Sequence, residues 1–255
     1  MPTQADSAAL QRLARGHMQR QVREVAQTQT ALARLWDRTM DPADIDGSFQ
    51  KFQALATPLI KTARDRGELT AQTYFEQSKA EAGYTTPPAT VDFQPTATLE
   101  NRNALHATSV AFAKRQIKRG VPAGQALSAA KIAMLGSAKR RVLEAPRRRI
   151  IALSKKDKDV KAWARVSDGH PCPFCLMLVS RGPVYSFGTG DFQAHDRCGC
   201  SAMPVYRNDR SNGWTPAAKD ARKLYDDWGG DYNDVRWALA HPDEAEAALA
   251  KRKAA

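Results

Sequence analysis

Every cysteine of the chain lies in one short stretch, and the four residues form two pairs. The first pair is Cys172 and Cys175, and the second is Cys198 and Cys200, with His195 just before it. A C-x-x-C turn places two thiolates on one side of a metal ion, and a second pair can close the other side of a tetrahedron. The spacing therefore predicts a structural zinc (Zn2+) site.

Five donors compete for four positions around such an ion. Cys172, Cys175 and His195 are the natural first three ligands, and either Cys198 or Cys200 completes the tetrahedron. Four thiolate or imidazole ligands make a closed site, whereas a catalytic zinc keeps one position open for water or substrate. The donor set thus favours a metal that stabilises the fold.

Two other uses of the cysteines need to be weighed. Cys-Pro-Phe-Cys alone resembles a thiol–disulfide redox motif, which requires a strand before it and a helix after it, but that role leaves His195 and the second pair unused. Two disulfides would suit an exported chain. Residues 2–7, P-T-Q-A-D-S, lack the basic and apolar regions of a signal peptide, so we expect reduced thiols in a cytosol.

Positive charge is concentrated in one part of the chain. The formal net charge is +12, and residues 101–165 alone carry +14, from 17 Lys plus Arg against 3 acidic residues. Such a field suits a polyanion, although a basic run is often only a solvated helix face. The segment has no aromatic stacking platform and no groove-reading module, so contacts with a nucleic acid are expected to be made to its phosphates and not to be sequence-specific. The residues expected to make them are Lys139, Arg140, Arg141, Arg147, Arg148, Arg149, Lys155 and Lys156.

Residues 1–83 are predicted to form a helical hairpin. Asp6 or Ser7 caps the first helix, whose apolar stripe runs from Leu10 to Trp36 and is more typical of a core than of a subunit interface. The second helix is expected from near Ser48 to Gly83, with a kink at Pro58. The apolar residues expected to face inward on it are Phe49, Phe52, Leu55, Leu59, Ile60, Leu69 and Phe75.

The remaining segments are predicted from the proline and glycine residues that end helices and strands. Residues 84–98 form a proline-rich connector, and residues 99–160 form a basic helical region with one helix over 99–119 and another that begins at Pro122 and is interrupted at Pro146. Residues 161–207 form the zinc-binding module, with short strands at 163–166, 182–185 and 203–206. Residues 208–255 form a helical tail broken at Gly229-Gly230 and His241-Pro242.

The expected fold class is α+β, mostly α. The chain has 255 residues, of which 42% are hydrophobic, enough for one large or two modest domains. No apolar run approaches the about 20 residues that span a bilayer, so we expect a soluble protein without membrane contact.

The cysteine region also resembles a known family. The runs W-A-R-V-x-D-G-x-P-C-x-F-C-x-x-L-x-S-R-G-P-V-Y and H-D-x-C-x-C-x-x-x-P-V are similar to those of the MuF-like minor head proteins of tailed bacteriophages of actinobacteria. The resemblance is strong over residues 161–206 and only architectural before them. The family's paired-cysteine and H-x-x-C-x-C pattern carries over to Cys172, Cys175, His195, Cys198 and Cys200. Its common H-P-x-C-R-C appears here as H-D-R-C-G-C, without the arginine.

The resemblance implies a role in head morphogenesis and in DNA packaging or release. It implies a virion protein inside the capsid near the portal vertex, synthesised in the host cytoplasm. The implied partners are the portal protein, the major capsid protein, other copies of the chain and packaged double-stranded DNA. These expectations agree with the basic segment and with a metal loaded under reducing conditions.

The alternative to a structural role is catalysis. Ser180, Asp191 and His195 could be drawn as the triad of a capsid maturation protease, but no nucleophile-elbow pattern surrounds any serine. His195-Asp196 beside cysteines resembles part of a zinc-dependent nuclease, over too short a match to count. We therefore expect a protein that is not an enzyme.

Overall fold

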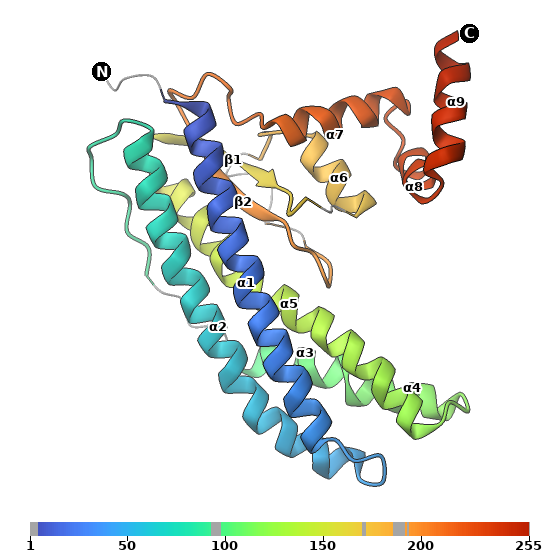
Figure 1. Ribbon diagram of the computed structural model, residues 1–255. Helices are drawn as coiled ribbons and strands as arrows, with labels where there is room; N and C mark the ends of the chain where they lie inside the picture. The colour runs from blue at the N-terminus through green and yellow to red at the C-terminus, as the bar shows by residue number, and fades with distance from the viewer. Residues whose placement is uncertain (1–4, 93–97, 170–171, 186–191, 193, 255) are drawn as a thin grey trace.

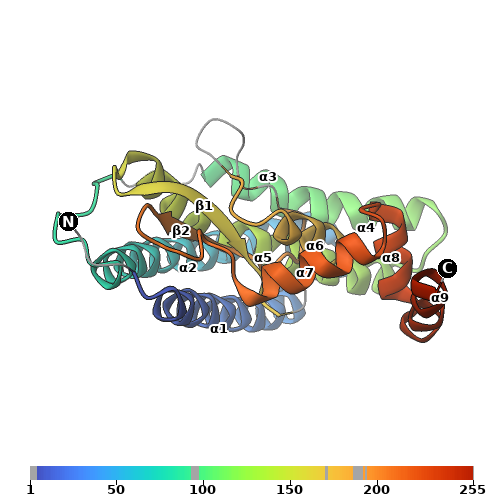
Figure 2. The same cartoon turned by 90° about the horizontal axis from the view of Figure 1, so that it is seen from above.

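The computed structural model describes residues 5–92, 98–169, 172–185, 192 and 194–254. Within these residues the chain is mostly helical with a single two-stranded sheet, which confirms the α+β, mostly α class. Figure 1 shows two long antiparallel helices that run the length of the molecule, with the sheet near one end. Seen from above, the described ends of the chain lie at opposite sides (Figure 2).

Helices α1 (Ser7–Thr39) and α2 (Ile45–Glu81) form the predicted hairpin. Asp6 caps α1, because its carboxylate accepts hydrogen bonds from the backbone N–H groups of Ala8 and Ala9. α2 begins at its cap Asp44, a few residues earlier than predicted. It ends just before Gly83, whose φ of 80° is the left-handed conformation that glycine adopts at helix ends.

The inward face of α2 is partly different from the predicted one. Phe49, Phe52, Ile60 and Phe75 are buried, but Leu55, Leu59 and Leu69 are 54%, 39% and 68% exposed. Small residues fill the buried face instead, since α2 packs against both α1 and α5 and small side chains let the backbones approach. We call this buried row the α2 seam, and it consists of Phe52, Ala56, Ile60, Ala63, Gly67 and Ala71.

Helix α5 (Ala123–Lys156) runs without interruption through Pro146, so the predicted break there is wrong. The buried proline ring packs against Gly67 of the α2 seam, where an added Cβ would lie 3.0 Å from Pro146 Cδ. This tertiary contact offsets the one ladder hydrogen bond that proline removes. Helix α2 likewise continues through Pro58.

The predicted helix over 99–119 is two helices, α3 (Thr98–Thr108) and α4 (Val110–Lys118). Ser109 separates them, and its buried hydroxyl donates to the carbonyl of Leu105, which competes with the regular helical ladder. Gly120, with φ of 88°, ends α4 as predicted.

Strands β1 (Val160–Val166) and β2 (Ser201–Tyr206) pair antiparallel, with Trp163 opposite Pro204 and Val166 opposite Ser201. The sequence predicted a strand in each of these two segments. The expected strand over 182–185 is wrong: in this described segment only Tyr185 pairs, in an isolated bridge with Trp163. Pro183 has no N–H to donate to a ladder, which explains the difference.

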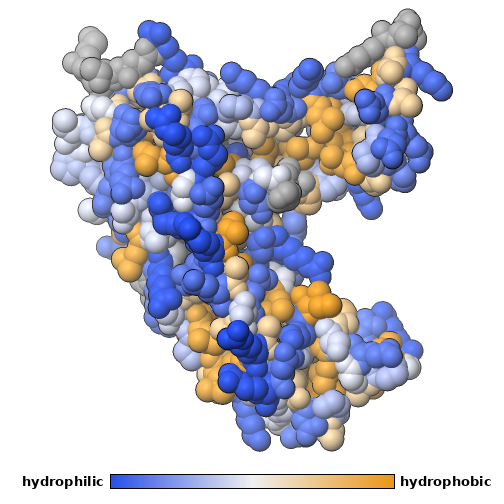
Figure 3. All heavy atoms as spheres, viewed as in Figure 1, coloured by the Kyte–Doolittle hydropathy of each residue, from blue (hydrophilic) through white to orange (hydrophobic). Residues whose placement is uncertain are grey.

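Three helices follow the sheet: α7 (Pro216–Asp227), α8 (Tyr232–Ala240) and α9 (Pro242–Ala254). They confirm the predicted breaks, and Gly229 and Gly230 both have positive φ. Trp228 and Val235 of this tail pack with Leu176 and Val179 in a separate apolar cluster. Figure 3 shows a recess between the C-terminal helices and the end of the molecule that holds α4. Among the described residues, no helix combines the length and apolar character needed to cross a bilayer.

The contact between Pro146 and Gly67 can be tested by one methyl group. We expect Gly67→Ala to lower the free energy of unfolding by about 1–3 kcal/mol, because the new Cβ would press on a buried ring that cannot rotate away. The control is Gly124→Ala in the first turn of α5, where a Cβ meets nothing within 4 Å and should stabilise by about 0.4–1 kcal/mol. Urea unfolding measures both, and equal stabilities for the two variants would contradict the packing described here.

Candidate metal centre

Helix α6 (Pro173–Ser180) brings the first cysteine pair to one point. Cys172 caps this helix, and its Sγ accepts a hydrogen bond from the backbone N–H of Cys175 at 3.3 Å. Pro173 occupies the first turn, where its missing N–H costs nothing. Both sulfurs therefore lie at the N-terminal end of α6, where the helix dipole favours thiolates. The sequence reading did not predict this helix.

The second pair arrives just before β2. Since β2 pairs with β1 and the chain leaves β1 shortly before α6, the sheet brings Cys198 and Cys200 next to the first pair. The Sγ atoms of Cys175 and Cys198 lie 3.5 Å apart. All four cysteines are free thiols, and Cys175, Cys198 and Cys200 are buried.

His195 completes the cluster. Its Nε2 lies 2.8 Å from Cys172 Sγ and 3.5 Å from Cys175 Sγ. Its Nδ1 lies 2.5 Å from the backbone carbonyl oxygen of Asp196. A carbonyl only accepts, so Nδ1 carries the proton and Nε2 presents its lone pair to the thiols, as in histidines that bind metals.

The spacing of the donors fits a tetrahedral zinc ion. The ligand atoms of Cys172, Cys175 and His195 lie within 4.8 Å of one another, as do those of Cys175, Cys198 and Cys200. A Zn–S bond of about 2.3 Å in a tetrahedron separates two sulfurs by about 3.8 Å. The 3.5 Å between the Sγ atoms of Cys175 and Cys198 is close to this value. Cys175 belongs to both groups, and Cys198 and Cys200 both remain candidates for the fourth ligand.

Two buried arginines flank Cys198. Arg147 Nη2 lies 3.6 Å and Arg165 Nη1 4.0 Å from its Sγ. Hydrogen bonds from the thiols of Cys175 and Cys200 lower the pKa of Cys198, and the positive charge of Arg147 lowers it further. The thiolate, which is the form that binds metal, is therefore favoured at this position.

Arg147 is the clear correction to the predicted DNA contacts. It is 1% exposed, and it donates from Nε to the carbonyl of Cys200 at 2.8 Å and from Nη2 to that of Cys198 at 2.9 Å. A side chain held in this way cannot reach a phosphate on an open helix face. The sequence carried one sign of this, because Arg147 follows Leu143 by one helical turn on the inward face of α5.

The other predicted basic residues lie at or near the surface of α5. Lys139 lies 3.8 Å from Asp168, Arg140 lies 3.6 Å from Asp196, and Arg141 and Arg148 both contact Glu144. Arg149 is half-buried and donates to Gln72 and to the carbonyl of Val91. Lys155 and Lys156 are exposed. The surface available to a polyanion is thus narrower than predicted.

The sequence alone did not identify two residues beside the candidate metal centre. Gly199 sits where the resembled family has arginine, and an added Cβ there would lie 1.6 Å from Asp168 Oδ2, so a carboxylate already fills that space. Phe192 lies under the Arg165 guanidinium, 3.8 Å from its ring centroid. Neither contact can be predicted from neighbouring residues, since each depends on a side chain from a distant part of the chain.

The proposed triad is not supported by the geometry. Ser180 is buried, and its hydroxyl donates to the carbonyl of Met177 at 2.8 Å. It lies at the opposite end of α6 from Cys172, which His195 contacts, a span of about 12 Å at 1.5 Å per residue. Asp191 lies outside the described residues.

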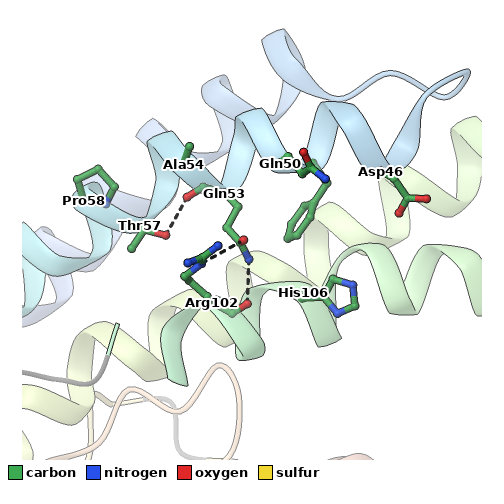
Figure 4. A pocket seen from close by; sticks show the side chains of 9 residues that line it. Asp46, Gln50, Gln53, Ala54, Thr57, Pro58, Arg102 and His106 are labelled. Atoms are coloured by element: carbon green, nitrogen blue, oxygen red, sulfur yellow. Dashed lines mark hydrogen bonds between the residues drawn. The ribbon is translucent and has the colours of Figure 1, made fainter. Parts of the chain in front are cut away.

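A separate pocket of about 750 Å³ lies between α2 and α3. Figure 4 shows Gln53 and Arg102 pointing toward each other across it, and they exchange hydrogen bonds of 3.1 and 3.3 Å. Thr57 donates to the carbonyl of Gln53. Gln53, Arg102 and Thr57 therefore satisfy one another, and the titratable groups that also line the pocket are Asp46 and His106.

The role of Arg147 yields a direct prediction. Arg147→Leu should lower the free energy of unfolding by about 3–5 kcal/mol, because the carbonyls of Cys198 and Cys200 lose their donors in a buried setting. The neighbouring Arg148, whose side chain is 63% exposed, is the matched control, and Arg148→Leu should cost about 1 kcal/mol or less. Urea unfolding followed by tryptophan fluorescence compares the two, and similar losses would refute the buried role.

Comparison with known proteins places the chain among bacteriophage proteins. The family described as VG15 protein matches residues 1–230. The Gene 15 protein of Mycobacterium phage D29 is 54% identical over 50 residues, which cover 18% of this chain and 18% of that relative. No solved structure gives a significant match. Because the family match covers most of the chain, this protein belongs to the VG15 protein family.

Proposed function

We propose that this protein is a minor head protein of a tailed bacteriophage, with a structural role and a module stabilised by zinc. The convergence of five soft donors from two segments, at the junction of β2 and α6, carries the proposal. Membership of the VG15 family and the similarity to a phage protein support its viral setting. The resemblance of residues 161–206 to MuF-like proteins supports a place inside the capsid near the portal vertex.

The metal in this proposal has a structural task. The two strands of the module pack on α1, α2 and α5, but the segments that carry the cysteines and His195 contain only one short helix, so a bound ion would stabilise these segments. Cys172, Cys175 and His195, with Cys198 or Cys200, would hold the ion, and four such ligands leave no position for a substrate. The protease and nuclease alternatives gain no support from the positions of Ser180 and His195.

The proposed partners follow from the surface and from the resemblance. Exposed cations on α5 suit non-specific contacts with packaged double-stranded DNA. The stripe from Leu10 to Trp36 packs within the chain's own core, so contacts with the portal protein, the major capsid protein or other copies must use other surfaces.

Loss of metal should unfold the module. In Cys172→Ser/Cys175→Ser we expect zinc content to fall from about one ion per chain to near zero and residues 161–206 to become sensitive to protease, because their fold depends on the ion. Ser180→Ala, in the same helix, is the control and should keep its zinc. Elemental analysis and limited proteolysis measure both effects, and wild-type protein purified under reducing conditions without any transition metal would refute the site.

Location is tested on particles. In purified heads of the phage or prophage that encodes this chain, we expect the protein to be present in far fewer copies than the major capsid protein and to survive treatment with external nuclease and protease, because the shell encloses it. Quantitative mass spectrometry of the particles measures this. Recovery of the protein solely from the unassembled fraction of the lysate would contradict the proposed role.

A further inference from the structure

A groove of about 510 Å³ lies beside the metal centre, between α5 and the segment just before His195. Its size is in the range of sites for small ligands, about 300–1,000 Å³. One wall is the face of α5 that ends near Lys155, and the other is formed by Phe192 and Ala194. The lining residues are Arg140, Glu144, Arg147, Arg148, Ile151, Ala152, Lys155, Phe192 and Ala194.

The rim of the groove is strongly positive. The side chains of Arg140 and Arg148 are 46% and 63% exposed, and Lys155 is exposed as well. Glu144 is the single carboxylate among the lining residues, and it is shared: besides Arg148 it contacts Arg64 at 3.4 Å and Arg141 at 3.5 Å. Asp196, which is not among the lining residues, lies 3.6 Å from Arg140. Two carboxylates thus face four guanidinium groups and the ammonium of Lys155, so an anion in the groove meets a net positive field.

The deepest cation of the groove has an unused donor. Arg147 binds the cysteine loops through Nε and Nη2, but its Nη1 is buried and has no hydrogen-bond partner among the described residues. A buried N–H of a guanidinium without an acceptor is costly, and burial strengthens its attraction for an anion. Because Arg147 is 1% exposed, it acts on an anion in the groove through its charge and not by direct contact.

Phe192 indicates which part of a nucleic acid fits the groove. Its ring is covered by Arg165 at 3.8 Å, by Arg147 at 4.8 Å and by Trp163, whose ring centroid lies 5.6 Å away. These three side chains occupy much of the ring surface on which a base would have to stack. The groove therefore offers charge to a backbone and little surface to a base.

We propose that this groove binds a phosphate group of a DNA backbone through Arg140, Arg148 and Lys155 at its rim, with the charge of the buried Arg147 beneath its floor. The inference rests on the proposed function for the presence of DNA, and it narrows the contact from a whole basic helix to one place. Phe192 and Ala194 immediately precede the proposed ligand His195, so the ion that holds His195 also holds the second wall. Phosphate binding and metal binding are then linked through one loop.

The test adds one negative charge inside the groove and one outside it. Ala152 lines the groove, whereas Ala129 lies on the exposed surface of the same helix outside it, so Ala152→Glu and Ala129→Glu change net charge equally. Binding of a fluorescein-labelled mixed-sequence DNA duplex of about 20 base pairs is measured by anisotropy over a salt series. We expect Ala152→Glu to weaken binding about tenfold or more and to flatten the salt dependence, and Ala129→Glu to change affinity less than about twofold.

A second pair of variants removes charge in place of adding it. Arg148→Ala/Lys155→Ala should reduce the slope of log K against log salt by about 1–2, and Arg115→Ala/Lys118→Ala, two exposed cations of α4, should reduce it less. Equal effects of the groove and control variants would show a diffuse field and overturn the proposal. Calorimetric binding of inorganic phosphate that Ala152→Glu abolishes, with DNA affinity unchanged, would overturn it too.

Zinc content and thermal unfolding of every variant separate this inference from the proposed function. A wild-type protein without zinc that still distinguishes Ala152→Glu from Ala129→Glu would refute the metal site and support the phosphate site. If the wild-type protein contains zinc but Ala152→Glu and Ala129→Glu bind DNA with equal affinity, the metal site is supported and the phosphate site is refuted.

Discussion

The buried guanidinium of Arg147 joins the two halves of this molecule. It extends from the middle of α5 and donates to the carbonyls of Cys198 and Cys200, 51 and 53 residues further along the chain. The guanidinium is planar and has several donors in fixed directions, so it holds the two carbonyls in a defined orientation. Together with the hydrogen bond from the backbone N–H of Arg197 to the carbonyl of Gly136, this side chain holds the second cysteine pair against α5.

A buried positive charge needs compensation, and the cysteines supply it. Burial lowers the pKa of Arg147, and negative charge on Cys198 and Cys200 opposes that shift. Arg165, also buried, approaches the same sulfur of Cys198. Three thiolates and one imidazole around a divalent ion carry a net charge of about −1. The two arginines carry +2, so they would more than offset the charge of a zinc centre of this composition, and the centre would stabilise them in return.

The α2 seam sets where this interaction can form. Small residues such as Ala56, Ala63 and Gly67 bring α2 and α5 close, and Gly67 accommodates the ring of Pro146. The contact keeps α5 helical through the proline, so that the next residue, Arg147, keeps its inward direction. Arg140, Arg148 and Lys155 then lie along the groove. One helix in this way supplies a structural cation to the cysteine loops and a row of cations to the groove.

The sequence alone determined what local chemistry controls. Asp6, Gly83 and Gly120 mark helix ends because a side-chain cap or a left-handed backbone acts within a few residues. The mostly α class, the strand type of residues 163–166 and 203–206, and the set of cysteines and histidine brought together were all predictable. The helix at 173–180 was missed because short apolar runs do not distinguish helix from strand.

The tertiary structure decided what depends on distant partners. Periodicity shows that a helix has an apolar face but not which neighbour covers it, so Leu55 and Leu69 were assigned to a core that small residues occupy. Pro146 removes a hydrogen bond within α5, which is a local effect, and the packing that outweighs this loss comes from α2. Arg147 looks like its surface neighbours in a basic run, and only the carbonyls and thiolates of a distant loop make it a buried structural residue. Contacts over such separations arise from packing and leave no local pattern to read.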